Sequence, residues 1–540
     1  MSAPRMPSTA VHRFDMAPSV KMPRSRFDLS KGRKMTFDSG YLYPAMAPLE
    51  IYPGDTISFK PSFFARLSTP LKPVMDNIYL QWFAFFVPNR LVWTNWEKLL
   101  GAQNNPGDSI SYITPTIPLA AGGAAVGTLH DYFGLPSGAQ ITAGFNVNAL
   151  PSRGYQKIWN EWFRDENMQN SVTVDTGDGP DVLANYALRK RGKRPDYFTT
   201  ALPWTQKSTS PVTIPAGSTT APVNLVPFTT STNPMKMRLA STDAIVANDT
   251  GMSVYGASTA GAIGKDATTA GHVIDPNGRL IADISGAYSV TINALRLAEA
   301  TQALLERDAR GGTRLVELIK SHWGVTNPDF RLQRSELLGG GRTNINIHPV
   351  PLTNKGDGTT PGAQGNLAAF GTAMMNNGGF VKSFTEHGFI HLLVCAYADL
   401  TYQQGVDLLW TRSTRYDYYV PSFAHLGEQA ITTGEIYKTG AAGDAVVFGY
   451  TERWNELRYG KSDIVGKFRS DYATPLDSYH LSQRFTAAPV LGDTFITETP
   501  PISRIVAVTS EPQFIMDSWY DIKAARILPV YGIPSMTLRL

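Results

Sequence analysis

Hydrophobic and polar residues alternate along several stretches of the chain, which is the pattern of β-strands. In "IYPGDTISFKPSFFARLSTP" the apolar positions Ile57, Phe59, Pro61 and Phe63 alternate with polar residues and predict a half-buried strand. The following "NIYLQWFAFFVPNR" is apolar at nearly every position and predicts a strand buried on both faces. Strand-like runs return at "FTEHGFIHLLVCAYADLTY", "DAVVFGY" and "RIVAVTS".

Helical periodicity is confined to three segments. "LVWTNWEKLLG" and "PSRGYQKIWNEWFRDENM" predict short helices, and Pro151 with Ser152 marks the start of the second. The longest segment is "TINALRLAEATQALLERDARGGTRLVELIKSHWG", in which Gly311 and Gly312 predict a break. No repeat of fixed period occurs, which argues against solenoids and propellers. The pattern as a whole predicts a mainly β protein with a few helices.

Between Ser208 and Gly286 the chain is rich in Ser, Thr, Ala and Gly and has no helical periodicity. This stretch is too long for an ordinary loop, so it is either disordered or a separate β-rich excursion. The short apolar groups "VNLVPF", "AIVA" and "HVI" recur as brief strands would, and we therefore favour the excursion.

The composition is that of a globular protein that works in solution. The chain has 540 residues, 42% hydrophobic and 17% charged, which exceeds the size of one simple core. No apolar run approaches the roughly 18 residues of a membrane helix, and "MSAPRMPSTAVHRFDMAP" lacks the apolar core of a secretory signal, so we expect no membrane insertion. The single cysteine, Cys395, excludes an intramolecular disulfide and is expected to be a buried small hydrophobe.

Basic residues gather in two places, although the formal net charge is only +4 and any nucleic-acid contact must therefore be local. Five of the six positions from Arg189 to Arg194 are basic, within "LRKRGKRPDYFTTALPWTQKS". The other group predicts an extended basic arm, or equally a frayed terminus that contacts nothing. It comprises eight residues against two acids: Arg5, Arg13, Lys21, Arg24, Arg26, Lys31, Arg33 and Lys34.

No set of residues predicts catalysis, a cofactor or a metal. "DTGDGPD" contains Asp175 and Asp178 but lacks the second copy of an aspartic protease and the terminal Glu of a calcium loop, so a Gly-rich turn is favoured. His387 and His391 stand four apart in an expected strand without a third ligand. "GGGR" has no Lys and Ser or Thr after it, and we interpret it as a flexible crossing. These absences favour a structural or binding protein over an enzyme.

Several phrases resemble the major capsid proteins of gokushoviruses, small tailless single-stranded DNA phages of the Microviridae. They follow the family's order from about residue 24 to the C-terminal tail and include "RSRFDLSKGRKMTFDSGYLYP", "FARLSTPLKPVMDNIYL", "RKRGKRPDYFTTALPWTQKS", "LLERDARGGTRLVELIKSHWGV", "RSTRYDYYVPSFAHLGEQA" and "SEPQFIMDSWY". The resemblance implies a viral jelly roll, an eight-stranded antiparallel β-barrel with long insertions, that forms a T=1 icosahedral shell around circular single-stranded DNA.

The same resemblance divides the chain into four parts. A basic N-terminal arm covers residues 1–45, the first part of the jelly roll with a helical insertion covers 46–207, and the Ser/Thr/Gly-rich insertion covers 208–290. The helical segment and the remainder of the jelly roll, with a C-terminal tail, cover 291–540. The insertion is similar to the family's protrusions at the threefold axes, which implies a role in host attachment.

The resemblance also implies partners and a location. The partners are further copies of the chain, in pentamers and trimers, the packaged single-stranded DNA, a small basic DNA-packaging protein, a pilot protein and a host-cell surface receptor. The chain would be part of the virion and be assembled in the cytoplasm of a bacterial host. Two other functions stay open on the residues alone: a single-stranded DNA-binding protein that forms no shell, and an enzyme acting on DNA or glycans through Asp175 and Asp178.

Two groups of residues are the candidates for contacts. The first would face the packaged DNA, and its members are Arg24, Arg26, Lys31, Arg33 and Lys34. The second would lie at subunit interfaces or at the base of the insertion, with an aromatic core as the alternative for the rings of "RSTRYDYY": Arg189, Arg191, Arg194, Tyr197, Phe198, Trp204, Arg412, Arg415 and Tyr416. For the run at 189–204 we favour the base of the insertion over contact with DNA.

Overall fold

The computed structural model divides the chain into two compact units, Met1–Thr205 with Val325–Leu540, and Gln206–Gly324. The residues that it describes are 23–105, 107–207, 292–311, 321, 333–351, 353 and 367–531, together with the backbone of six short strands between 223 and 282.

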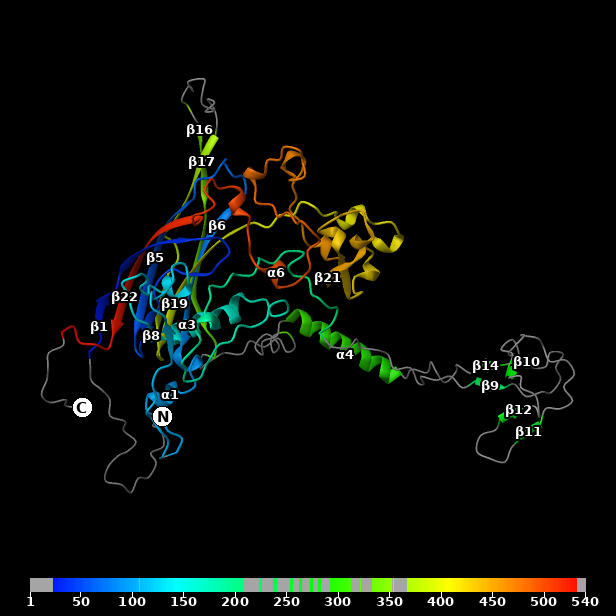
Figure 1. The fold of residues 1–540 in the computed structure, drawn as a ribbon, viewed down its shortest axis with the longest axis horizontal. Helices are drawn as coiled ribbons and strands as arrows, with labels where there is room; N and C mark the ends of the chain where they lie inside the picture. Colours follow the sequence, from blue (N-terminus) through cyan, green and yellow to red (C-terminus); the bar gives the residue numbers. More distant parts are fainter. Residues whose placement is uncertain are drawn as a thin grey trace, which may run out of the picture. The chain divides into compact units, whose positions relative to one another are not determined.

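The first unit contains a sheet of seven antiparallel strands, called the first sheet. Its order is β1-β22-β5-β17-β16, with β2 paired to β22 and β18 paired to β5. Figure 1 shows β22 in red between the blue strands β1 and β5. The strands are β1 (Ser25–Asp28), β2 (Lys31–Phe37), β5 (Thr56–Leu67), β16 (Asn346–Pro351), β17 (Leu367–Met375), β18 (Phe380–Ser383) and β22 (Phe514–Arg526).

A second antiparallel sheet of five strands packs against one face of the first sheet. Its order is β15-β6-β19-β3, with β4 paired to β19. The strands are β3 (Tyr43–Pro44), β4 (Leu49–Ile51), β6 (Ile78–Pro88), β15 (Glu336–Asn344) and β19 (Gly388–Ala398).

The main hydrophobic core lies between these two sheets. Strand β5 buries Ile57, Phe59 and Phe63, as the alternation predicted, and the ring of Phe59 lies 6.0 Å from Tyr520 on β22 and 6.3 Å from Trp82 on β6. The mainly antiparallel β fold expected for a viral jelly roll is confirmed. Among the described strands none pairs across the two sheets, so they form a two-sheet sandwich, and the expected eight-stranded barrel is not closed.

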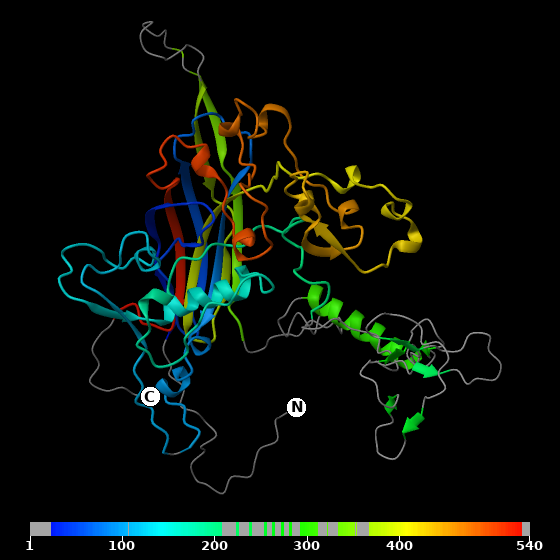
Figure 2. The same cartoon turned by 45° about the vertical axis from the view of Figure 1, so that its right-hand side comes forward.

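The central strands of the second sheet, β6 and β19, are packed on both faces, which confirms the prediction for β6 and explains the continuous apolar run of β19. Ile390 and Val394 of β19 face the first sheet, whereas Leu393 and Cys395 face a second cluster on the opposite side. Helix α3 (Leu150–Ile158) covers that side and lies across the strands (Figure 2). Burial raises the pKa of the Cys395 thiol to about 12, and this side chain is the buried hydrophobe that was expected.

The other predicted helices are also present, in shorter forms. Helix α3 continues into a π-helical turn at Trp159–Phe163, and α1 (Trp96–Leu99) lies within "LVWTNWEKLLG". In the second unit α4 (Ile292–Gly311) confirms the long helix as far as Gly311. The expected break at Gly312 and the helical pattern after it lie almost wholly outside the described residues. Helix α4 belongs to the second unit, not to the half of the chain that completes the jelly roll.

A third cluster of buried side chains lies in and around residues 400–485, here called the hairpin lobe, which is yellow and orange in Figure 1. Its strands β20 (Glu428–Thr432) and β21 (Val447–Glu452) form an antiparallel hairpin. Buried side chains of this hairpin, Ile431 and Phe448, pack with Tyr197, Phe198 and Phe495. The last of these belongs to the short helix α6 (Asp493–Ile496), so three distant segments of the chain meet here.

Two strand predictions near the C-terminus differ from the structure. "RIVAVTS" is not a strand: its first residue, Arg504, ends a 3-10 turn (Ile502–Arg504), and Val506 makes one isolated bridge with Pro70, whose missing N–H group cannot continue a ladder. Strand β22, the longest of the structure, was not predicted. Its buried face carries the polar Ser518 and its other face carries the exposed Trp519, which blurs the alternation.

The described part of the expected N-terminal arm is built into the two sheets, with β1 and β2 in the first and β3 in the second. Strands β1 and β2 both pair with β22, and Met35 and Phe37 of β2 are buried in the main core. Residues 1–22 lie outside the described residues.

The expected β-rich excursion is present in the second unit as three nested antiparallel pairs. Strand β9 (Val223–Leu225) pairs with β14 (Leu280–Ala282), β10 (Met237–Leu239) with β13 (His272–Ile274), and β11 (Ser253–Tyr255) with β12 (Ala262–Gly264). The predicted strands in "VNLVPF" and "HVI" are thereby confirmed, and "AIVA" lies outside the described residues.

The two faces of β5 give a direct test of the sandwich. Phe59→Ala empties a site between the sheets and is expected to lower the free energy of unfolding by about 3–5 kcal/mol. Phe64→Ala on the same strand serves as the control, because the Phe64 ring is 46% exposed on the opposite face and its loss is expected to cost far less. Urea unfolding of the purified proteins measures both effects, and equal effects would contradict the assignment of the two faces.

Candidate assembly and nucleic-acid surfaces

The basic run at residues 189–194, here called the basic strap, is built into the body of the first unit. Its backbone runs between two other segments: Arg191 N–H donates to the carbonyl of Gly40 (2.9 Å), and Lys193 N–H donates to the carbonyl of Ile496 (2.7 Å). Isolated bridges also join Lys190 to Tyr41 and Gly192 to Thr497. The strap therefore links the start of the sandwich to the segment that follows α6.

Each of the five cations of the strap lies over an aromatic ring of its own chain. The distances to the ring centroids are 5.9 Å for Arg189 and Trp159, 4.9 Å for Lys190 and Tyr41, 4.7 Å for Arg191 and Tyr397, 4.2 Å for Lys193 and Phe495, and 5.5 Å for Arg194 and Tyr397. Such contacts contribute about 0.5–2 kcal/mol each, and more as they are desolvated. The cations thus pack within the first unit.

Hydrogen bonds complete this arrangement. Arg191 donates to the side-chain oxygen of Gln81 (3.0 Å), Lys193 donates to that of Gln483 (2.9 Å), and Arg194 pairs with Asp399 (3.3 Å). Burial lowers the pKa of the Lys193 ammonium to about 8. Side chains that are committed in this way leave few donors for phosphate groups.

Glu498 lies beneath the strap and is the most unusual titratable group of this region. Its side chain is fully buried, and neither carboxylate oxygen has a hydrogen-bond partner among the described residues. Burial raises its pKa to about 7, although Arg191, Lys193 and Arg194 favour the charged form. The carboxyl group is therefore half protonated near neutral pH.

The aromatic residues after the strap belong to the core of the hairpin lobe. Tyr197 is buried and donates to Glu435 (2.9 Å), and the Phe198 ring packs edge-on against Tyr402 and Phe448. Trp204 is half-buried. Tyr197 and Phe198 therefore pack inside the first unit.

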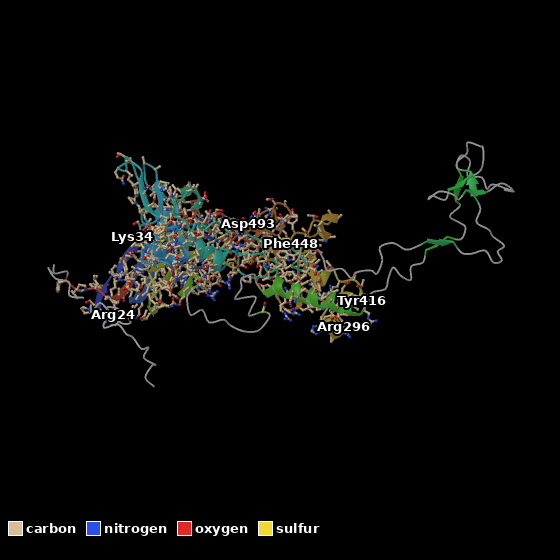
Figure 3. All side chains as sticks on the ribbon, turned by 90° about the horizontal axis from the view of Figure 1, so that it is seen from below. Arg24, Lys34, Arg296, Tyr416, Phe448 and Asp493 are labelled. Atoms are coloured by element: carbon tan, nitrogen blue, oxygen red, sulfur yellow. The ribbon has the colours of Figure 1, made fainter. Side chains whose placement is uncertain are left out.

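The hairpin lobe also exposes a group of large rings, here called the aromatic patch. The exposed fractions are 79% for Trp410, 66% for Tyr416, 53% for Tyr418 and 49% for Tyr419. Arg415 is exposed beside them, whereas Arg412 is turned inward and pairs with Glu456 (3.1 Å). Figure 3 shows Tyr416 on this lobe. Trp410 was not a sequence candidate, because "LLW" by itself has the pattern of a buried turn.

Local hydrogen bonds hold the aromatic patch in one conformation. Asp417 closes a capping box with Thr414 around the 3-10 turn Arg415–Asp417 and accepts the backbone N–H groups of Ser413 (3.0 Å) and Thr414 (2.7 Å). These bonds lower the pKa of Asp417 to about 2. A rigid loop loses little conformational entropy when its exposed rings bind a partner.

The five candidates for DNA contact separate into two groups. Arg24, Arg26 and Lys34 lie on the face of the first sheet that points away from the core, and Arg24 donates there to Thr56 (2.6 Å). Figure 3 shows Arg24 and Lys34 on this part of the molecule. Lys31 and Arg33 alternate to the other side of β2, where Lys31 is exposed at the edge of the sheet and Arg33 donates to the carbonyl of Tyr132 (2.6 Å).

The motifs that suggested chemistry have structural partners. Asp178 accepts hydrogen bonds from the indole of Trp93 (2.7 Å) and from Asn95 (2.9 Å), and Asp175 accepts the N–H of Gly177 (2.8 Å). "GGGR" is not a flexible crossing but part of β15, where a Cβ at Gly341 would lie 2.7 Å from the indole nitrogen of Trp82. Its glycines make room for the largest ring of the main core.

Metal and membrane sites are not found in the part of the chain that the structure describes. No group of three or more His, Cys, Asp or Glu side chains there is suited to a metal ion, and His391 of β19 is buried against α3 with no hydrogen-bond partner for its ring among the described residues. No described helix has the length and apolar character needed to span a bilayer.

Comparison with known proteins identifies relatives over nearly the whole chain. A family model described as Capsid protein (F protein) matches residues 15–536. The chain is 46% identical to Capsid protein VP1 of Bdellovibrio phage phiMH2K over 531 residues, which is 97% of each chain. It is 37% identical to Capsid protein VP1 of Chlamydia phage 1 (98% of this chain and 99% of the relative) and 32% identical to that of Spiroplasma virus 4 (97% and 98%).

Glu498 predicts an unusual dependence of stability on pH. Between its ordinary value of 4.5 and about 7, the folded chain keeps a proton that the unfolded chain has lost, so the free energy of unfolding falls as the pH rises through this window. Glu498→Gln removes this pH-dependent contribution to the free energy of unfolding. The difference in melting temperature, variant minus unmodified protein, is therefore expected to be larger at about pH 7.5 than at about pH 5. Glu511→Gln, at an exposed carboxylate, is the control, and a difference independent of pH would contradict the assignment.

Proposed function

The chain belongs to the capsid protein (F protein) family, and from this premise we propose that copies of it assemble into a T=1 icosahedral shell around circular single-stranded DNA. The protein is a gokushovirus-type major capsid protein and a component of the virion. The geometry of the shell, its cargo and its assembly in the cytoplasm of a bacterial host belong to the proposal.

The aromatic patch is the single observation that carries self-association. Trp, Tyr and Arg dominate the binding energy of protein interfaces, and soluble proteins rarely expose such residues together without a partner. Here Trp410, Tyr416, Tyr418 and Tyr419 are exposed next to Arg415 on a loop that Asp417 holds in place. A second copy of the chain is the partner that a capsid protein always meets, and repetition of one such contact generates closed symmetry.

The second unit supports a protrusion at the threefold axes. Each of its strand pairs is only three residues long, and isolated pairs of this length are unstable in water. Three copies that meet at a symmetry axis would bury part of these strands against one another. The proposal therefore assigns trimer contacts and host-receptor attachment to residues 208–290, and it assigns the pentamer contacts to the first unit.

The remaining partners follow from charge. A net charge of +4 per subunit is small beside a genome with one negative charge per nucleotide, so a small basic packaging protein is part of the proposal. Arg24, Arg26 and Lys34 share the open face of the first sheet and are proposed to contact phosphates, and Lys31 is proposed to do so at its edge. A pilot protein completes the particle. The family is structural, and the proposal gives the chain no catalytic role.

Replacement of two rings of the aromatic patch is expected to prevent assembly. Trp410→Ala with Tyr416→Ala removes exposed anchors, so the variant should keep its melting temperature and lose particles in sedimentation and electron microscopy. Tyr472→Ala is the matched control, since this ring is 48% exposed outside the patch. Assembly of the double variant at the normal protein concentration would contradict the role of the patch. A wild-type protein that binds DNA but never forms particles would instead support the alternative function, a single-stranded DNA-binding protein.

The second unit predicts the outline of the particle. Electron microscopy of wild-type particles should show knobs at the threefold axes, and deletion of residues 208–290 should leave shells without knobs, because the insertion is a separate unit. A smooth wild-type shell would contradict the assignment of the insertion to the protrusions.

A further inference from the structure

The face of the first sheet that points away from the main core is open to solvent in the first unit, and it is here called the outer sheet face. The register of the strands places Lys34, Asp517, Phe64 and Met374 side by side in one row across β2, β22, β5 and β17. Trp519 follows Asp517 by two residues on β22 and stands in the neighbouring row. Phe64 is the diagonal neighbour of Trp519, and such diagonal residues have Cα atoms about 7–8 Å apart.

Large apolar side chains of this face are exposed where a sheet would normally carry polar residues. Among the described residues the exposed fractions are 68% for Met374, 61% for Ile515, 55% for Trp519 and 46% for Phe64. They line or border a depression of about 530 Å³. Soluble proteins keep such contiguous apolar surfaces small unless a partner covers them.

The Trp519 ring extends over strand β2. A Cβ placed at Gly32, on this neighbouring strand, would lie 3.3 Å from the Cε3 atom and 3.6 Å from the Cζ3 atom of the Trp519 ring. The six-membered part of the indole therefore occupies space that a side chain at position 32 would fill. Because Trp519 is still 55% exposed, part of its ring is accessible to a partner.

The outer sheet face carries more cations than carboxylates. Lys523 is matched by Asp28 (2.5 Å) and Asp521 (3.2 Å), and Lys34 lies 3.7 Å from Asp517. Four exposed cations have no ion-pair partner among the described residues: Arg24, Arg26, Lys60 and Arg66. Arg66 stands directly opposite Ile515, and Lys60 stands directly opposite Asp521, so these charges flank the exposed rings.

We propose that the outer sheet face binds single-stranded nucleic acid, with bases stacked on Trp519 and Phe64 and phosphates held by Lys34, Lys60 and Arg66. Aromatic rings on a basic surface bind single strands without regard to sequence, because every base offers a flat π-face. The inference rests on the proposed function, which supplies single-stranded DNA as the cargo, and it adds base stacking to the phosphate contacts proposed for Arg24, Arg26 and Lys34.

The charge of the face argues against two other occupants. Two copies that joined through this same face would bring the unpaired Arg26, Lys60 and Arg66 of each copy together. Residues 1–22 of the chain carry Arg5, Arg13 and Lys21 against the single acid Asp15, so they have the same sign as the face. A polyanion with flat apolar groups complements both the positive charge and the exposed rings of this surface.

The test measures binding of fluorescein-labelled oligo(dT) to the purified protein by fluorescence anisotropy at several salt concentrations. Trp519→Ala and Phe64→Ala are each expected to weaken binding by about tenfold to a hundredfold with an unchanged salt dependence. Lys60→Ala and Arg66→Ala are each expected to reduce the slope of log affinity against log salt by about 0.7. Tyr472→Ala removes an exposed ring with a lysine 5.6 Å from its centroid, outside the face, and is expected to bind as wild type.

Particle formation, followed in parallel, separates failure of this inference from failure of the proposed function. Trp519→Phe keeps a flat ring and should retain most of the affinity for oligo(dT). If Trp519 had a purely structural role, the loss of affinity would instead follow the fall in melting temperature from one variant to the next. Variants at Trp519 and Phe64 that bind oligo(dT) as wild type would overturn the inference, and intact particles would then leave the proposed function standing. Loss of particles with unchanged DNA affinity would also overturn it, since a second copy would then cover the face.

Discussion

The structure depends on the burial of one pair of strands, β6 and β19, on both of their faces. Trp82 of β6 fills the space between the sheets, and the chain leaves room for its ring at Gly341 and Gly378, where a Cβ would lie 2.7 Å and 2.8 Å from the indole. On the other side Cys395 and Leu393 require a cover of their own. The first sheet, helix α3 and the basic strap are all positioned by the need to exclude water from these two strands.

This constraint decides which surfaces remain for partners. Strands β6 and β19 have no free face, and among the described residues the outer face of the first sheet and the loops of the hairpin lobe are two surfaces that remain for partners. Both carry exposed rings next to cations, Trp519 and Phe64 with Lys34 on the sheet, and Trp410 and Tyr416 with Arg415 on the lobe. A shell protein needs contacts with its own copies and with its cargo, and two separate surfaces of this kind allow both to be made at once.

The basic strap shows why charge along the sequence is a poor guide to a binding site. Five cations in six positions resemble a phosphate-binding run, yet each of them lies over a ring of the same chain, and Arg194 pairs with Asp399. Their partners Tyr397 and Phe495 are some 200 and 300 residues away, so no local pattern reveals them. By contrast, the plainer cations Lys60 and Arg66, scattered on strand β5, are exposed and have neither an ion-pair partner nor an aromatic ring beneath them among the described residues.

The sequence alone determined the antiparallel β class, the alternation of β5, the double burial of β6, the helices at α3 and α4 and the family, because each is written in local periodicity or in phrases of consecutive residues. Only the tertiary structure decided which face of β22 is open, that "GGGR" is a strand, and that Arg33 and Arg412 turn inward while Trp410 stays exposed. The physical reason is that side-chain exposure depends on what packs against it, and in a sheet sandwich those neighbours come from distant segments of the chain.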